Sequence, residues 1–225
     1  MKALRVAALA LIGTLAVATP ARTDAQQYSP LALGVDVSAL RLARDVATTQ
    51  LLAGQVLGVH ASASFKRFEI EGHYAEGALT PEGLAAGEPE NLVEASLLAR
   101  VRLLNWLAVG GGPHLRAFVT PSGTARWSRV EANARFDGEL IAGVAQLRID
   151  AWYAVGTEVN VQGGGDGALG GEVGLTIRIP RTPTSLQVSY LADRASFTNG
   201  GAEFVEGLRV ALMLDRIGPA RRTTR

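Results

Sequence analysis

The sequence contains no cysteine, and this absence excludes several kinds of chemistry at once. Disulfides, thiolate metal sites and thiol nucleophiles all require cysteine. Histidine is scarce as well, with three residues in 225, so we expect neither a metal site nor a bound cofactor. Charge of one sign is not in excess, because 22 Lys and Arg residues balance 21 Asp and Glu. A nucleic-acid partner is therefore not expected, since such proteins normally carry a strong basic surplus.

Long apolar runs are also missing, except at the start of the chain. Residues 1–25 combine Lys2 and Arg5 with an uncharged run and small residues near Ala25, a pattern that predicts a secretory signal peptide. The longest uncharged stretch after it, residues 46–65, contains Thr, Gln, His and Ser. It is too polar for a membrane-spanning helix, which needs about 20 apolar residues.

What the sequence does have is an alternation of apolar and polar residues. In residues 92–103 one face is entirely apolar, whereas the other carries Glu94, Ser96, Arg100 and Arg102. Alternation with a period of two is the main sequence signal of a β-strand with two different faces. The same pattern recurs along the chain, so the protein is expected to be all-β.

The alternating segments predict about ten strands, with eight as the alternative count. Their predicted ranges are 31–42, 54–65, 67–76, 91–103, 106–119, 130–146, 148–161, 171–180, 184–196 and 204–215. A membrane-crossing β-strand needs about 9–11 residues, whereas strands of globular proteins have about 5–6. The lengths favour a closed, antiparallel, up-and-down transmembrane β-barrel over residues 26–215, followed by a basic C-terminal tail over residues 216–225.

The predicted links point the same way. Those after the first, third, fifth, seventh and ninth strands are long and rich in Gly, Pro and polar residues, and the others are short. Outer-membrane barrels have short periplasmic turns and longer extracellular loops. With both ends of the barrel in the periplasm, this asymmetry predicts an even number of strands.

The chain also resembles a known family. A signal peptide, alternating strands, the segment AVGGGPHLRAFV and the final GLRVALML, with Gly207, Val210 and Leu212, look like small bacterial outer-membrane β-barrel proteins of the OmpA-like and OmpX-like type. The resemblance implies a bacterial outer-membrane location, with outer-membrane lipids and the outer-membrane assembly machinery as partners. Aromatic residues near the predicted strand ends fit two interfacial girdles. A secreted, calycin-like binding barrel is the soluble alternative, and it would point its apolar faces inward.

In the membrane interpretation the polar faces line the lumen. Buried charges must be paired or hydrated, so we expect an ion-pair network that fills much of the interior. Its predicted members are Glu69, Glu71, Glu94, Arg100, Arg102, Arg116, Asp150 and Arg178. Further acids assigned to the lumen are Asp36, Asp137, Glu139, Glu158, Glu172 and Asp193, with Arg209 and the three histidines. This set carries more acidic than basic groups.

Two detailed contacts follow from the predicted hairpins. Arg102 and Arg100 should lie opposite Ala108 and Gly110, where there is room for long side chains. With a turn at residues 147–148, Trp152 should cover Gly143. Asp150 is expected to lie level with Arg178, and Glu69 and Glu71 near Arg100 and Arg102.

The sequence predicts a monomeric outer-membrane barrel with a structural or surface-exposed role and no enzymatic activity. The first alternative is a narrow, cation-preferring passive pore. The second is a barrel enzyme, for which His60 with Ser62, or His73, would be the candidate groups. Residues 163–167 are not a phosphate loop, because no Lys and no helix follow them, and Asp166 alone offers too few oxygens for calcium.

Overall fold

The computed structural model describes residues 31–45, 49–82, 88–160 and 164–215. The predicted signal peptide, the first residues of the predicted barrel segment and the predicted basic tail lie outside these ranges. No helix in the described part of the chain is long and apolar enough to cross a membrane.

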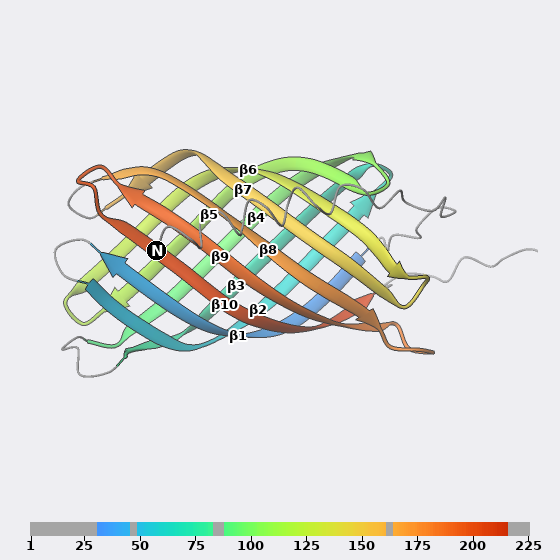
Figure 1. Cartoon of the computed structure of the whole chain (residues 1–225), viewed down its shortest axis with the longest axis horizontal. Coiled ribbons are helices and arrows are strands. Elements are labelled where there is room, and N and C mark those ends of the chain that lie inside the picture. Colours follow the sequence, from blue (N-terminus) through green and yellow to red (C-terminus); the bar gives the residue numbers. More distant parts are fainter. Residues whose placement is uncertain (1–30, 46–48, 83–87, 161–163, 216–225) are drawn as a thin grey trace, which may run out of the picture.

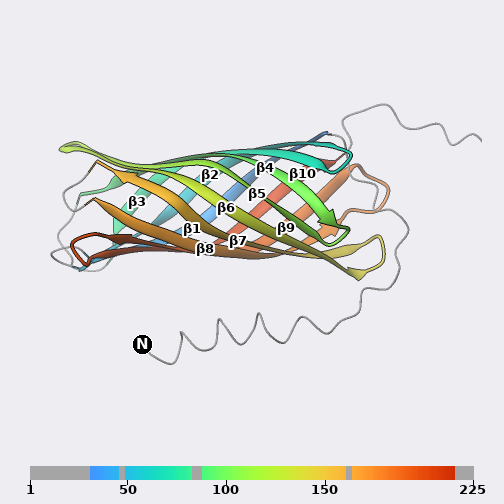
Figure 2. The ribbon, with the colours of Figure 1, turned by 90° about the horizontal axis from the view of Figure 1, so that it is seen from above.

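The described residues form ten antiparallel strands in a closed barrel (Figures 1 and 2). The strands are β1 (Leu31–Asp45), β2 (Thr49–Phe65), β3 (Phe68–Pro81), β4 (Glu90–Leu104), β5 (Leu107–Thr120), β6 (Gly123–Ile141), β7 (Ala145–Val159), β8 (Gly165–Arg178), β9 (Thr184–Phe197) and β10 (Ala202–Asp215). Each pairs with its neighbours in sequence, and β1 pairs with β10 from Ala32↔Asp215 to Asp45↔Ala202. The predicted ten-strand, all-β barrel is confirmed.

The links between strands lie at the two ends of the barrel, and their lengths differ little between the ends except for the longer link between β3 and β4. At the turn end lie the links β2–β3, β4–β5, β6–β7 and β8–β9, together with the start of β1 and the end of β10. At the loop end lie the other five links. Several strands extend farther toward the loop end than predicted: β6 begins at Gly123 instead of 130, and β3 continues to Pro81 instead of 76. The predicted alternation of short and long links is therefore largely wrong, because most residues assigned to the long links belong to strands: the link between β5 and β6 is reduced to residues 121–122, next to the pair Thr120↔Gly123.

The outside of the barrel is apolar on every strand. Large apolar side chains point outward and are exposed, among them Val35, Leu57, Ile70, Leu97, Leu115, Val130, Val155, Leu169, Val188 and Leu208. Leu57 is 67% exposed and Val155 64%. A water-soluble barrel would bury such residues, so the calycin-like alternative is wrong. An apolar outer band around a polar interior is the arrangement of a transmembrane barrel.

This polarity inverts toward the loop end. On β1 the inward residues change from Asp36 and Ser38 to Leu42, while the outward residues change from Val37 to Arg41. Outward charged residues near the loop end of other strands are Glu76, Arg126, Glu158 and Arg194. The strands have 14 to 19 residues, more than the roughly 9–11 that cross a membrane. The loop-end part of the barrel is therefore built to stand in water, beyond the lipid.

Two tyrosines mark the change. The hydroxyl of Tyr74 donates to Glu76 at 2.7 Å, and that of Tyr190 donates to Glu206 at 2.7 Å. Both rings are exposed on the outer face. An aromatic ring in lipid with its hydroxyl on a charged, hydrated partner is typical of a membrane interface.

A bulge in β7 makes the predicted orientation of one lumen side chain wrong. Val130 pairs with Gly156 but Glu131 pairs with Ala154, so Val155 is an extra residue on β7. An extra residue reverses which side chains point inward beyond it. Glu158, predicted to line the lumen, is for this reason exposed on the outside.

The β6–β7 turn is also displaced from its predicted position. It lies at residues 142–144 instead of 147–148, and Gly143 occupies the turn with φ of 67° and no side chain near it. The predicted contact between Trp152 and Gly143 is therefore wrong. Trp152 instead lies opposite Gly170 of β8, where a Cβ atom would come within 2.6 Å of the indole ring. An aromatic side chain does cover a glycine, but on the other neighbouring strand.

Candidate functional site in the barrel lumen

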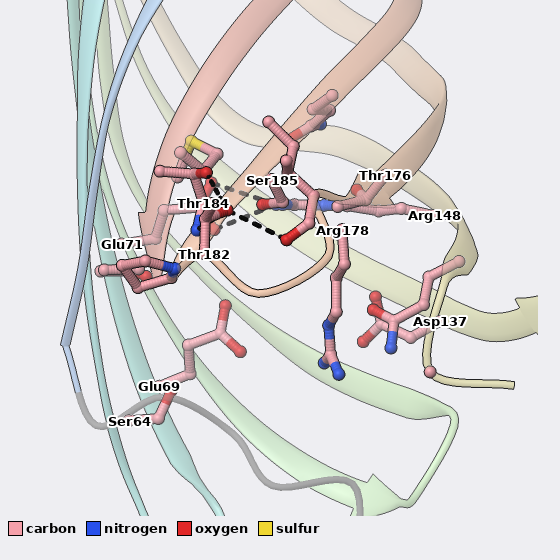
Figure 3. Close-up of a pocket in the computed structure, with 18 of the residues that line it drawn as sticks. Ser64, Glu69, Glu71, Asp137, Arg148, Thr176, Arg178, Thr182, Thr184 and Ser185 are labelled. Atoms are coloured by element: carbon pink, nitrogen blue, oxygen red, sulfur yellow. Dashed lines mark hydrogen bonds and ion pairs between the residues drawn. The ribbon is translucent and has the colours of Figure 1, made fainter. Parts of the chain in front are cut away.

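The vestibule is a cavity of about 640 Å³ at the turn end of the lumen. Figure 3 shows Glu69, Glu71, Asp137, Arg148 and Arg178 around it. Its remaining wall includes Thr182 of the β8–β9 turn and Thr184 and Ser185 at the start of β9. The cavity is polar, and its inner side is closed by charged side chains that reach across the barrel.

The inner side of the vestibule is built around two buried arginines. Arg135 of β6 forms ion pairs with Glu69, with Glu71 at 2.6 Å and with Asp150 at 3.0 Å. Arg100 of β4 lies within 3.1 Å of Glu71, 3.4 Å of Glu69 and 3.5 Å of Asp150. Since β3 and β6 are not neighbours in the barrel, these side chains cross the interior.

Two more arginines enlarge this first cluster. Arg102 pairs with Asp137 at 3.4 Å and Glu69 at 3.5 Å. Arg148 pairs with Asp150 at 2.8 Å and Glu71 at 3.0 Å. Each carboxylate thus has at least one guanidinium partner, which is the condition for keeping such charges away from water.

A second cluster lies nearer the loop end and bridges the barrel again. Asp193 of β9 is 1% exposed and accepts from Arg129 at 2.6 Å, and it lies 3.0 Å from Arg116. Arg116 is held by Glu94 at 2.8 Å, and Arg129 by Glu131 at 2.6 Å. Because β9 is not adjacent to β5 or β6, this cluster also spans the lumen.

Seven of the eight predicted network residues lie in these two clusters. They are Glu69, Glu71, Glu94, Arg100, Arg102, Arg116 and Asp150. The predicted hairpin register is confirmed, because Arg100 pairs with Gly110 and Arg102 with Ala108.

Arg178 is the exception among the predicted network residues. It is exposed and forms no ion pair with any described residue. The predicted match of Asp150 with Arg178 is wrong, because Asp150 pairs with Glu172 in the ladder. The displaced β6–β7 turn accounts for this error, since it changes which residues of β7 and β8 lie level.

Sequence reasoning missed four network members. Glu131 and Arg135 alternate in step with Asp137, which had been assigned to the lumen, so the period of the strand already indicated them, whereas Arg129 precedes the predicted start of this strand at residue 130. Arg148 was missed because the predicted turn included it. An error of a few residues in a predicted strand boundary thus left a charged residue out of the predicted interior.

An apolar plug fills the loop end of the lumen. Its largest fully buried members are Phe118, Leu42, Leu52, Leu79, Leu92 and Val56, and the rings of Trp127 and Phe197 pack against each other at 4.8 Å. Arg44 lies over the Phe118 ring at 4.8 Å and is held by Glu90 at 2.9 Å and Glu203 at 3.1 Å. The expectation of a polar lining along the whole lumen is wrong here, because it assigned one polarity to each strand face over its full length.

Three residues on adjacent strands form a separate group. Asp36, His60 and His73 place one ligand atom each within 4.8 Å of one another. Nε2 of His60 lies 2.9 Å from Oδ2 of Asp36, and Nε2 of His73 lies 3.5 Å from the same oxygen. The two imidazole rings stack with centroids 4.3 Å apart. Such a set of donors is able to hold a metal ion.

No protein-family model matches the chain, and no curated protein matches it. Solved structures of similar fold do match. Neisserial surface protein A is 12% identical with a TM-score of 0.43, over 84% of this chain and 99% of that one. The translocator domain of the autotransporter NalP from Neisseria meningitidis is 11% identical with a TM-score of 0.42, over 95% of each chain. An outer-membrane channel from Pseudomonas putida F1 is 14% identical with a TM-score of 0.43, over 85% of this chain and 100% of that one. These are barrels of the outer-membrane type that the sequence resembles.

Proposed function

We propose that the protein is a monomeric, non-enzymatic barrel of the bacterial outer membrane whose interior is closed to the flow of solutes and whose loop end projects into the surroundings. The observation that carries this proposal is the combination of two seals in one lumen. Charged side chains bridge non-adjacent strands at Arg135 and Asp193, and beyond them the apolar plug packs around Phe118. A porin channel needs about 16 strands, and eight are nearly filled by side chains, so ten strands leave little width to spare.

The direction of the barrel follows from its ends. The start of β1 and the end of β10 lie together at the turn end. Outer-membrane barrels have their longer loops on the extracellular side, and the longest link here, between β3 and β4, lies at the loop end, which supports an extracellular location for the water-exposed extension of the strands. There its outward charges would give a surface role to the protein, and outer-membrane lipids would contact the apolar band.

Single-channel recording tests the closed interior. We expect purified, refolded protein in planar bilayers to give no steady conductance steps, because both seals would have to open. A porin of known conductance is the positive control for the bilayers, and the double variant Phe118→Ala with Leu92→Ala, which opens only the plug, should stay silent because the charged bridges remain. The variant must show the folded gel shift before it is recorded.

The same recordings test the pore alternative. Regular steps from the wild type, with reversal potentials across a salt gradient that favour cations, would overturn the closed barrel and support a narrow cation-preferring pore. A silent wild type that remains silent over a range of applied voltages supports the proposal.

A further inference from the structure

We propose that Asp36, His60 and His73 form a binding site for one divalent transition-metal ion inside the barrel, with Zn²⁺ as the ion to test first. Two imidazoles and a carboxylate are the protein ligands of a common class of zinc site that keeps one position for water. The proposed structural role does not need a metal ion, so this site would be a further property of the barrel.

The strand pairing brings the three residues together. Asp36 is on β1, His60 on β2 and His73 on β3. His60 and His73 are directly opposite each other in the ladder, and Asp36 lies opposite Gly58, two residues before His60. All three side chains point into the lumen, and the side chain of Asp36 is 1% exposed, with His60 at 14% and His73 at 9%. The site is therefore inside the barrel, on strand pairs that have no register shift.

The facing atoms of these residues are unsatisfied. Oδ2 of Asp36, Nε2 of His60 and Nε2 of His73 are buried, and none makes a hydrogen bond within the described residues. The nitrogen–oxygen distances of 2.9 and 3.5 Å are short, but hydrogen bonds also need the N–H to point at the acceptor. Three buried polar atoms that meet only one another, without a well-directed hydrogen bond, are costly. A metal ion bound by all three would remove that cost.

The other oxygen of Asp36 is already fixed. Oδ1 lies 3.4 Å from the Ser38 hydroxyl, which donates to it, and 3.5 Å from Nε of Arg209. Arg209 is in turn paired with Glu172 at 3.2 Å, so its positive charge is offset. Outer partners of this kind orient a ligating carboxylate and leave one oxygen for the metal.

The surrounding residues leave room for the carboxylate and for water. A Cβ atom at Gly58 would come within 2.3 Å of Oδ2 of Asp36, so a side chain there would push this carboxylate out of its present position. A cavity of about 20 Å³ adjoins His73, with Ser38 and Arg209 also in its wall. That is enough for about one water molecule, which would supply a fourth ligand.

The third histidine provides a matched control. His114 is in the same cross-strand row as His60 and His73, through Ser96. Its Nδ1 lies at hydrogen-bonding distance, 2.8 Å, from Glu131, within the second ion-pair cluster. It is not part of the three-residue group. Replacing it removes one lumen histidine without touching the proposed ligands.

The experiment uses the full barrel, refolded in detergent without a polyhistidine tag, and measures Zn²⁺ affinity by competition with a chromophoric chelator. We expect one Zn²⁺ per chain. His60→Asn, His73→Asn and Asp36→Asn should each weaken binding at least about 100-fold, beyond the roughly 10- to 100-fold of an outer partner. His114→Asn should stay within about threefold of wild type. The folded gel shift confirms that each variant forms the barrel.

X-ray absorption at the zinc edge of the loaded wild type gives a second readout that needs no variant. Two imidazole nitrogens and light oxygen ligands would support the site even where a variant fails to fold. The proposal is overturned if the folded wild type binds no stoichiometric Zn²⁺, if binding is unchanged by His60→Asn and His73→Asn, or if His114→Asn abolishes it.

Discussion

Replacing Arg135 with methionine is expected to lower the free energy of unfolding by about 3–5 kcal/mol. Arg135 is buried and is the guanidinium partner of Glu69, Glu71 and Asp150. Its removal leaves three carboxylates crowded in a desolvated space with fewer positive charges, and an unpaired buried charge costs more than the ion pair itself contributes. The measurement is equilibrium unfolding in urea, with the protein in lipid vesicles.

Arg178→Met is the matched control for this variant. Arg178 belongs to the same vestibule but is exposed and has no ion-pair partner among the described residues. A surface substitution of this kind should change the free energy of unfolding by about 0.5 kcal/mol or less. Equal losses for Arg135→Met and Arg178→Met would mean that the cluster does not stabilise the barrel.

Replacing Phe118 with alanine is the second large effect that we expect, a loss of about 3–5 kcal/mol in the free energy of unfolding. The side chain is 1% exposed, at the centre of the plug with Leu42 and Leu92. Truncation leaves a cavity that the neighbouring groups cannot move in to fill, because the strands of the closed barrel are fixed by their hydrogen-bonded ladder. The ring also lies beneath Arg44 at 4.8 Å, and that contact is lost as well.

The control for the plug is an aromatic residue on the outer face near the same end. Phe204 is 38% exposed, so Phe204→Ala should cost about 1 kcal/mol at most. Comparable losses at positions 118 and 204 in the same unfolding measurement would contradict a packed apolar interior. A loss confined to Phe118→Ala supports it.

The strand number and the face of most strands were predictable, because alternation along the chain records the two sides of a barrel wall. The register of the β4–β5 hairpin followed from its short turn, and it placed Arg100 opposite Gly110 correctly. Long-range partners were not accessible in this way. Nothing near Asp193 in the sequence indicates that Arg116 and Arg129 reach it across the lumen.

Two features of the structure make strict alternation a wrong guide to which side chains face the lumen, and each has a physical reason. The bulge at Val155 reverses the phase of β7, so Glu158 leaves the lumen. The polarity inversion along each strand makes a buried Leu42 and an exposed Arg41 follow a buried Asp36 and an exposed Val37. Assigning one polarity to a whole strand face therefore fails, because the barrel wall passes from lipid into water along each strand. The histidine count likewise gave no indication that His60 and His73 stack against each other.

The most direct test of the membrane setting uses the absence of cysteine. A single cysteine introduced at Val35, Leu57, Arg41 or Arg194 would be the only one in the chain, and it can carry a nitroxide label on the barrel refolded in lipid vesicles. The collision rates of each label with oxygen, which concentrates in lipid, and with a water-soluble nickel complex are then compared. We expect positions 35 and 57 to favour oxygen and positions 41 and 194 to favour the nickel complex. Equal access of the nickel complex to all four positions would contradict a barrel that crosses the membrane with its apolar band.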